Sequence, residues 1–312
     1  MATLYKFTTT DDTSYGGMEW GTGVTNEATG DEEQDLCSDG WLHAYESIKL
    51  AFLMNPAHGN YGPTYHLWEC TGTVGKTKQQ TKVGCRELTS DTEIDPSGLI
   101  ATDSMRLKFA ILSARQVYAG ATWDAWADAA LASIDGLLMP DAAGARAIYT
   151  EISQEARNAA QRAVVMLDRV QVDVASAADL SGDTEAEEKA ELAKLELKKA
   201  RDIAAGATPE AAVRSEARVR ELAEQAYTLA AATASTPEAD RAVEMAGRSK
   251  VAADIAVKQA ASIAAAAAAV RAGLQEDSLS MEAARAACMA GEAGDVDGQV
   301  IDFVAIAEEA YT

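Results

Sequence analysis

The second half of the chain consists of alanine-rich helical segments, each introduced by its own start signal. Two of these signals are identical, Thr208-Pro209-Glu210-Ala211 and Thr236-Pro237-Glu238-Ala239, and they lie 28 residues apart, which is four heptads. Each places a capping hydroxyl before a proline at the first helical position, with an acid in the first turn. Similar starts at Asp183 and Ser280 extend the pattern, so helix after helix is predicted.

An apolar seam with a spacing of three and four residues follows the predicted helices, as in a coiled coil. Most of the seam is alanine, which lets backbones approach closely but buries little area per residue, at about 25 cal/mol per Å². Such helices need length, high helix propensity or self-association to be stable. The seam residues expected to pack helices or subunits together are Ala190, Ala193, Leu197, Val219, Leu222, Ala226 and Leu229.

Glycines and apolar spacing set the expected ends of the later helices. One long helix is predicted from Pro237 to about Arg271, with Gly247 tolerated inside it. The glycine-rich segment 291–298 is expected to form a loop. Residues 300–311 alternate apolar and acidic positions, which predicts a short helix that docks on the rest of the protein.

The first part of the chain has a different character. Its β-prone runs, separated by Gly, Asn, Asp and Pro, predict strands at residues 4–8, 65–70 and 82–88. Residues 45–54 have helical spacing, and Asn55-Pro56 is expected to end that helix. The predicted fold class is therefore an α+β N-terminal module followed by a mostly α-helical, alanine-rich antiparallel bundle or coiled-coil-like region.

Composition changes abruptly between residues 100 and 130, because all five Trp and all three His lie before Asp128. We expect a small α+β domain at 1–100, connecting helices at 101–140 and an alanine-rich helical bundle at 141–312. Residues 105–119 and the pair Trp123 and Trp126 have the helical spacing of these connectors.

Charge excludes several classes of partner. The chain has 27 Lys and Arg against 49 Asp and Glu, a net charge of −22, which disfavours direct binding of nucleic acid or of an anionic membrane surface. Residues 1–12 are polar and end in acids, so no secretory signal is expected. The most apolar stretch, 260–270, is far shorter than the roughly 20 residues of a membrane span. These features predict a protein kept in the cytoplasm.

Candidate site residues lie in the first part of the chain. His43, in a tight run between a turn and a helix, is a ligand contact or a structural histidine, and Trp41, Trp68 and Glu69 complete the candidate ligand-binding set. An enzyme built on His43, Tyr45 and Glu69 lacks any accompanying catalytic signature, so no catalytic residue and no cofactor are predicted.

Two further motifs contain residue types that are found in binding sites. Zinc could in principle be held by Cys37, His43, His66 and Cys70, but their spacing fits no short zinc motif, and buried, reduced cysteines are preferred. Residues 72–77 contain Gly-Lys-Thr without the glycine spacing of a phosphate-binding loop, and the element after them reads as a turn or strand. Neither a metal site nor a phosphate loop is predicted.

The first 95 residues resemble an uncharacterised module encoded by tailed bacteriophages, which carries a Cys-x-x-Gly-[Leu/Phe]-His-Ala core and a later strand ending in Glu-x-x-Gly. Trp41 is inserted in that core here, and Glu69-Cys70-Thr71-Gly72 lacks a typical middle. The resemblance covers about a third of the chain and implies phage origin and fold, but no chemistry. The matching segments are Leu4–Phe7, Gly16–Trp20, Leu36–Tyr45, Met54–Pro56, Leu67–Glu69 and Lys82–Thr89.

Two classes of function follow as expectations. In the first, this is a non-enzymatic phage protein of the host cytoplasm or the virion, whose helices form a homo-oligomer or bind other phage proteins. In the second, the N-terminal module antagonises host defence by sequestering a small nucleotide-like ligand with Trp41, His43 and Trp68. We favour the first, because the helical part is over half of the chain and its seams are the most specific feature.

Overall fold

The computed structural model describes residues 2–62, 64–78, 80–181, 237–274 and 278–312. They form two compact units. Unit 1 joins Met1–Tyr149 to Ala261–Thr312, and unit 2 is Thr150–Ala260, which is therefore an insertion in the sequence of unit 1. The predicted seam residues Ala190, Ala193, Leu197, Val219, Leu222, Ala226 and Leu229 and the starts at Asp183 and Thr208 lie outside the described residues.

Unit 1 contains an antiparallel sheet with the order β1-β4-β5-β2, and β3 also pairs with β5. Hydrogen bonds from Tyr5 N to Tyr45 O (2.8 Å) and from Tyr45 N to Tyr5 O (2.9 Å) bring the chain just after β3 onto β1. Register shifts along β4 interrupt its pairing with β5, so the hairpin can bend strongly. The strands are β1 (Ala2–Thr8), β2 (Val24–Glu27), β3 (Leu42–Ala44), β4 (His66–Lys78) and β5 (Lys82–Ile94).

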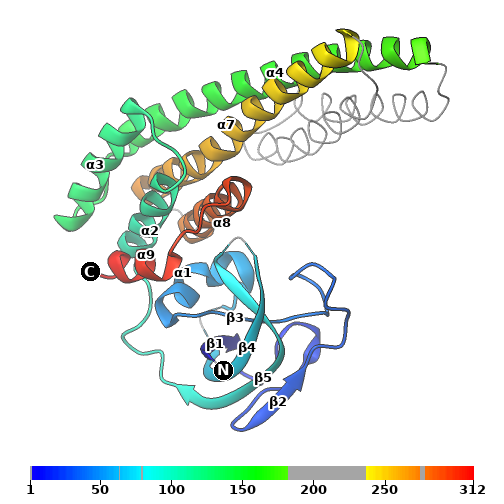
Figure 1. The fold of residues 1–312 in the computed structure, drawn as a ribbon. Helices are drawn as coiled ribbons and strands as arrows, with labels where there is room; N and C mark the ends of the chain where they lie inside the picture. Colours follow the sequence, from blue (N-terminus) through cyan, green and yellow to red (C-terminus); the bar gives the residue numbers. More distant parts are fainter. Residues whose placement is uncertain (1, 63, 79, 182–236, 275–277) are drawn as a thin grey trace. The chain divides into compact units, whose positions relative to one another are not determined.

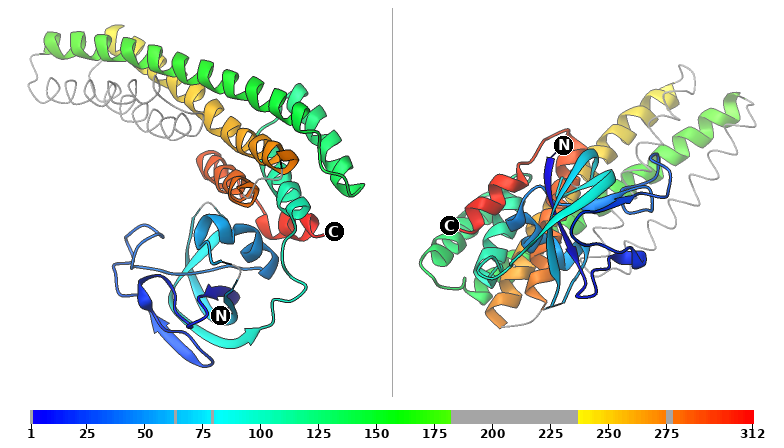
Figure 2. Two further views of the ribbon diagram at one scale, coloured as in Figure 1. Left: turned by 180° about the vertical axis from the view of Figure 1, so that it is seen from behind. Right: turned by 90° about the horizontal axis from the view of Figure 1, so that it is seen from below.

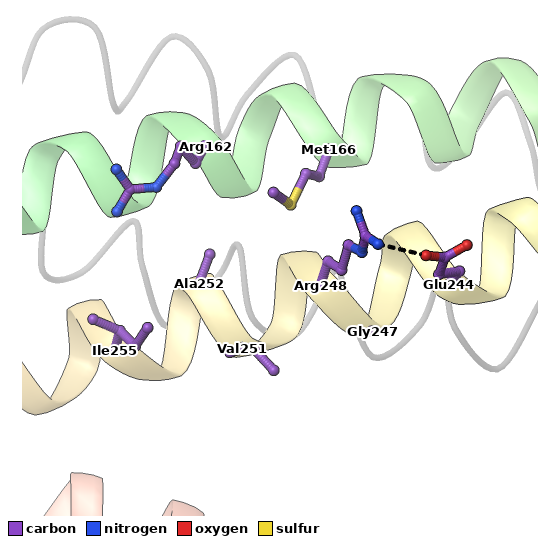
Figure 3. Close-up of a pocket in the computed structure, with 8 residues that line it drawn as sticks. All are labelled: Arg162, Met166, Glu244, Gly247, Arg248, Val251, Ala252 and Ile255. Atoms are coloured by element: carbon purple, nitrogen blue, oxygen red, sulfur yellow. Dashed lines mark hydrogen bonds and ion pairs between the residues drawn. The ribbon is translucent and has the colours of Figure 1, made fainter.

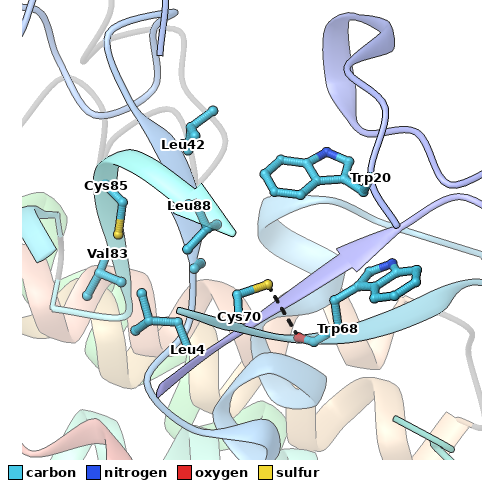
Figure 4. Packing of buried hydrophobic residues seen from close by; sticks show 9 residues of the cluster. Leu4, Trp20, Leu42, Trp68, Cys70, Val83, Cys85 and Leu88 are labelled. Carbon is cyan, nitrogen blue, oxygen red and sulfur yellow. Dashed lines mark hydrogen bonds between the residues drawn. The ribbon is translucent and has the colours of Figure 1, made fainter. Parts of the chain in front are cut away.

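A buried apolar cluster packs against the sheet (Figure 4). Gly72 lies where β4 bends, and a Cβ there would come within 2.8 Å of Leu88 Cδ1 and 3.1 Å of Cys85 Sγ. A side chain at this position would displace the core, so close packing favours glycine here. The cluster consists of Leu4, Trp20, Leu42, Ala44, Trp68, Cys70, Val83, Cys85 and Leu88.

The described chain also contains several helices and is therefore mixed α+β. The predicted connecting helices are present as α2 and α3, and the long helix from Pro237 is continuous through Gly247. No helix in the described ranges is long and apolar enough to cross a membrane. The helices are η1 (Tyr15–Gly17), α1 (Ile48–His58), α2 (Asp103–Arg115), α3 (Ala121–Asp135), α4 (Ala142–Ser181), α7 (Pro237–Leu274), α8 (Leu279–Asp297) and α9 (Phe303–Ala310).

Helix α1 runs past the proline that was expected to end it. It begins after Ser47, whose side chain accepts a hydrogen bond from Leu50 N, and it includes Pro56. Proline cannot donate to the carbonyl four residues earlier, which is that of Phe52. In its place Arg106 Nη1 of α2 donates to Phe52 O at 3.2 Å. The replacement of this bond by a side chain from another helix explains why the predicted end at Met54 was wrong.

Helix α8 also corrects a prediction, because it continues through the glycine-rich segment expected as a loop. Gly291 and Gly294 are buried in the helix, and the chain turns only at Gly298, which has φ +67°. A Cβ at Gly294 would lie 2.9 Å from Ile301 Cδ1 and 3.0 Å from Gln299 O. The lack of a side chain at Gly294 permits the return of the chain against the helix.

The C-terminal residues of the chain pack within unit 1. Helix α9 confirms the expected docking helix, and Phe303 contacts Phe109 of α2 with ring centroids 6.3 Å apart. Gln80, in the β4–β5 turn, donates to Asp295 Oδ1 (2.9 Å) and Gln299 O (2.8 Å) and accepts from Ile301 N (2.6 Å). Residues 261–312 thus belong to the same unit as the sheet, whereas the composition of the sequence predicted one domain for residues 141–312.

Candidate functional site

Unit 2 contains a groove between two helices that run side by side over a long distance (Figures 1 and 2). Near one end of unit 2, Gln259 Nε2 of α7 donates to Glu155 Oε2 of α4 at 3.2 Å. Buried alanines at 156, 159, 252 and 260 let the backbones approach. The groove has a volume of about 480 Å³ (Figure 3), and its walls are Arg162, Met166, Glu244, Gly247, Arg248, Val251, Ala252 and Ile255.

In the described part of the chain, two apolar side chains of the groove are exposed to solvent. Val251 is 59% exposed and Ile255 is 44% exposed. Gly247, Val251 and Ile255 follow each other at intervals of four residues, so they lie on one face of α7. A Cβ at Gly247 would meet no atom within 4 Å. This mid-helix glycine is therefore not required by close packing in the described structure, although it weakens a helix by roughly 1 kcal/mol relative to alanine.

Charges lie at the rim of the groove. Arg248 Nη2 and Glu244 Oε1 are 2.6 Å apart, one turn apart on α7, and both side chains are exposed. Such an exposed pair stabilises the helix by only about 0.3–0.5 kcal/mol. Arg162 lines the groove from α4 (Figure 3). An apolar floor with a charged rim is the arrangement that accepts the apolar face of an amphipathic helix.

This groove was not predicted from the sequence. The expected helix-packing surface was in residues 190–229, and Gly247 was expected only as a tolerated interruption of a long helix. The signal that could have identified the groove is the repeat of Gly247, Val251 and Ile255 every four residues beside charged positions.

In unit 1, Trp41 and His43 of the candidate ligand set lie near the same glycine of β5 and are engaged within the fold. Trp41 is buried, its Nε1 donates to Gln34 O at 3.2 Å, and its ring covers Gly75 and Gly84. His43 Nε2 contacts Leu36 O. These contacts hold the segment before β3 against the sheet, which is a structural role.

Trp68 and Glu69 follow each other on β4, with Trp68 buried and Glu69 exposed. Trp68 is 3% exposed and its Nε1 donates to Thr8 Oγ1 at 3.1 Å. Glu69 is exposed. Burial raises the pKa of Tyr5, and the negative charge of Glu69 raises it further. The indole N–H groups of Trp41 and Trp68 thus donate to different segments of unit 1. These contacts do not bring the two rings together around a shared cavity.

The residues weighed as a zinc set have separate partners. Lys82 Nζ donates to Cys37 Sγ, Cys70 lies in the sheet core, and His66 Nδ1 is 2.5 Å from Asp12 Oδ1. The Asp12 carboxylate accepts this hydrogen bond and thereby raises the pKa of His66. Across the described ranges of the chain, no group of three or more His, Cys, Asp or Glu is placed to hold a metal ion.

A cysteine–histidine contact that the sequence did not predict joins α1 to α8. Cys288 Sγ is 3.6 Å from His58 Nε2, and Tyr45 OH is 3.3 Å from His58 Nδ1. Burial, followed by the charge of Lys82, lowers the pKa of His58 to about 3, and burial raises the pKa of Cys288 to about 12. Both shifts favour the neutral form of each group, whereas a cysteine acts as a nucleophile in its thiolate form. No local signal could reveal it, because 230 residues separate the partners.

Comparisons with protein-family models, with curated proteins and with solved structures gave no match for this chain.

Proposed function

We propose that this protein is a non-enzymatic interaction module that self-associates through the helices of unit 2. The observation that carries the proposal is the groove between α4 and α7, with Val251 and Ile255 exposed above a floor of small residues. The resemblance of residues 1–95 to a phage module supports a role in a phage assembly, in the host cytoplasm or in the virion. The bundle or coiled-coil arrangement expected from sequence forms part of this proposal.

The energetics favour an interface that extends along the helices. Complete burial of one valine, isoleucine or methionine contributes about 1.5–3 kcal/mol, so covering the exposed portions of three such side chains contributes on the order of 3 kcal/mol. That amount alone supports only a weak contact. Helix α4 has 40 residues and a length of about 60 Å at about 1.5 Å per residue, which offers room for a longer contact.

A helix from a second copy is the occupant that the charges support. The rim has two arginines, Arg162 and Arg248, against one carboxylate, Glu244, and this excess of positive charge favours a partner with acidic flanks. The chain has 49 Asp and Glu and a predicted alanine-rich seam, so its own helices combine an apolar stripe with carboxylates. Self-association also suits an alanine seam, which gains stability from each additional helix that covers it.

The native mass of the full-length protein tests this proposal. Light scattering at micromolar concentration should give a defined oligomer for the wild type. The double variant Val251→Asp with Ile255→Asp should reduce the mass to that of one chain, because two carboxylates would be buried in the interface. The control Gln154→Glu with Asn158→Asp adds the same charge at exposed polar positions of α4 and should leave the mass unchanged.

Two results would contradict the proposal. A monomeric wild type would remove it directly. A double variant that keeps the oligomeric mass but loses thermal stability would show that another segment of the same chain covers the groove. The alternative of a nucleotide-like ligand held by Trp41, His43, Trp68 and Glu69 gains no support from their contacts, since both indole N–H groups are bonded within the fold.

A further inference from the structure

Lys82 and Cys37 form a close pair at the edge of the sheet in unit 1. Lys82, the first residue of β5, is only 7% exposed, and its Nζ lies 3.2 Å from Cys37 Sγ. Cys37 belongs to the segment before β3 and is exposed to solvent. A buried amine is therefore aimed at an accessible thiol, an arrangement that the structural roles described above do not require.

Cys37 is also the thiol that a soluble oxidant reaches first. All four cysteines of the chain are within the described residues, and only Cys37 is exposed. Burial raises the pKa of Cys70 to about 12 and that of Cys85 to about 11. Since the thiolate is the form that reacts with peroxide, burial protects these two cysteines, and the same cause protects Cys288.

We propose that Cys37 and Lys82 are a peroxide-responsive modification site that forms a reversible sulfur–nitrogen cross-link. The Cys37 thiolate attacks one oxygen of hydrogen peroxide, the O–O bond breaks, and hydroxide leaves, so sulfur is oxidised to the sulfenic acid while peroxide is reduced. Nζ of Lys82 gives up one proton to this hydroxide, which forms the first water, and then attacks sulfur. The S–O bond breaks, and the second hydroxide leaves with another amine proton as water. The chain loses two hydrogens, and one peroxide becomes two waters.

Proximity is the physical reason for this outcome. Sulfenic acids condense with nearby thiols or with backbone nitrogen, and no neighbouring thiol competes as well as an amine already in contact with the sulfur. Because burial restricts the Lys82 side chain, little conformational entropy is lost on reaching the sulfur. The bond would fix the segment that holds Leu36, whose side chain packs beside Gly84 of β5, and would remove the positive charge near His58.

Intact-mass measurement of the full-length protein tests the cross-link. The reduced protein is treated with equimolar hydrogen peroxide, quenched with catalase and divided, with one half re-reduced by dithiothreitol. The wild type should lose the mass of two hydrogens and recover it on reduction. Lys82→Arg, which keeps the charge but lacks the nucleophilic amine, should instead keep the sulfenic acid, which dimedone traps at Cys37. Cys37→Ser, a change at an exposed position, should show neither product.

A disulfide gives the same mass loss, so peptide mapping decides between the two products. The expected link joins the peptide containing Cys37 to the one containing Lys82, blocks tryptic cleavage after Lys82, and persists in Cys288→Ser. A link between Cys37 and another cysteine would overturn the proposal. Equal dimedone labelling of wild type and Lys82→Arg, with no cross-linked peptide, would overturn it as well.

Discussion

Lys6 is a buried lysine whose removal should change how stability depends on pH. It is 8% exposed, its Nζ donates to His43 O at 3.0 Å, and the same Nζ lies 4.6 Å from the centroid of the Trp20 ring. Burial lowers its pKa from 10.5 to about 8, although the neighbouring thiols Cys70 and Cys85 oppose the change. The perturbation is Lys6→Met, which keeps the length and apolar stem of the side chain.

The magnitude follows from linkage. In the unfolded chain Lys6 holds its proton up to about pH 10.5, and in the folded protein only to about pH 8. The unfolded state therefore binds more protons in this window, so the contribution of Lys6 to stability is least favourable below pH 8 and improves as the pH rises. The difference of about 2.5 pH units, at about 1.4 kcal/mol each, amounts to roughly 3 kcal/mol. On the order of 1 kcal/mol of this lies between pH 7 and pH 9.

Urea denaturation of wild type and Lys6→Met at pH 7 and pH 9 measures the effect. Relative to Lys6→Met, the wild type should gain about 1 kcal/mol in unfolding free energy from pH 7 to pH 9. Comparing the two proteins at each pH cancels the opposite contribution of Cys70 and Cys85, whose raised pKa values make stability fall as the unfolded thiols ionise. At pH 7 alone the variant also loses the bond to His43 O, so the change with pH is the decisive quantity.

A control separates burial from the loss of one positive charge. Lys76→Met, at a half-exposed lysine of β4, removes a charge from the same sheet without removing a buried ammonium. A stability difference between wild type and Lys6→Met that stays constant from pH 7 to pH 9, or that changes in the opposite direction, would refute the reasoning about Lys6.

Three further predictions test contacts that position the elements. Gln80→Ala should destabilise the protein by about 2–3 kcal/mol in urea denaturation, because it leaves Ile301 N without its acceptor. The control Gln116→Ala, at an exposed residue whose side chain bonds its own helix, should change stability little. Arg106→Leu should cost about 1–3 kcal/mol by leaving Phe52 O unpaired, and hydrogen exchange should increase first in α1. Gly247→Ala should raise the thermal stability of the dissociated protein by up to about 1 kcal/mol and, by placing a methyl group in the groove, weaken self-association in light scattering.

Sequence patterns predicted the parts of the candidate site that depend on local order. The long helix from Pro237 was predicted with Gly247 inside it, and that helix supplies one wall of the groove. The groove itself was not predicted, because an exposed Val251 and a buried one are identical in sequence. Exposure depends on what packs against the side chain, and in Figure 3 the Val251 side chain points away from α4. The contacts of Lys82 with Cys37 and of Cys288 with His58 were hidden for the same reason.

By itself, the sequence determined the α+β character, the three main strand regions, the connecting helices and the C-terminal docking helix, because alternation, helical spacing and capping act over a few residues. The tertiary structure alone decided where α1 and α8 end and which unit holds residues 261–312. Arg106 replaces the hydrogen bond that Pro56 cannot make, and Gln80 joins a turn to residues more than 200 positions later. The stabilisation from these hydrogen bonds depends on partners that are distant in sequence, which no local pattern encodes.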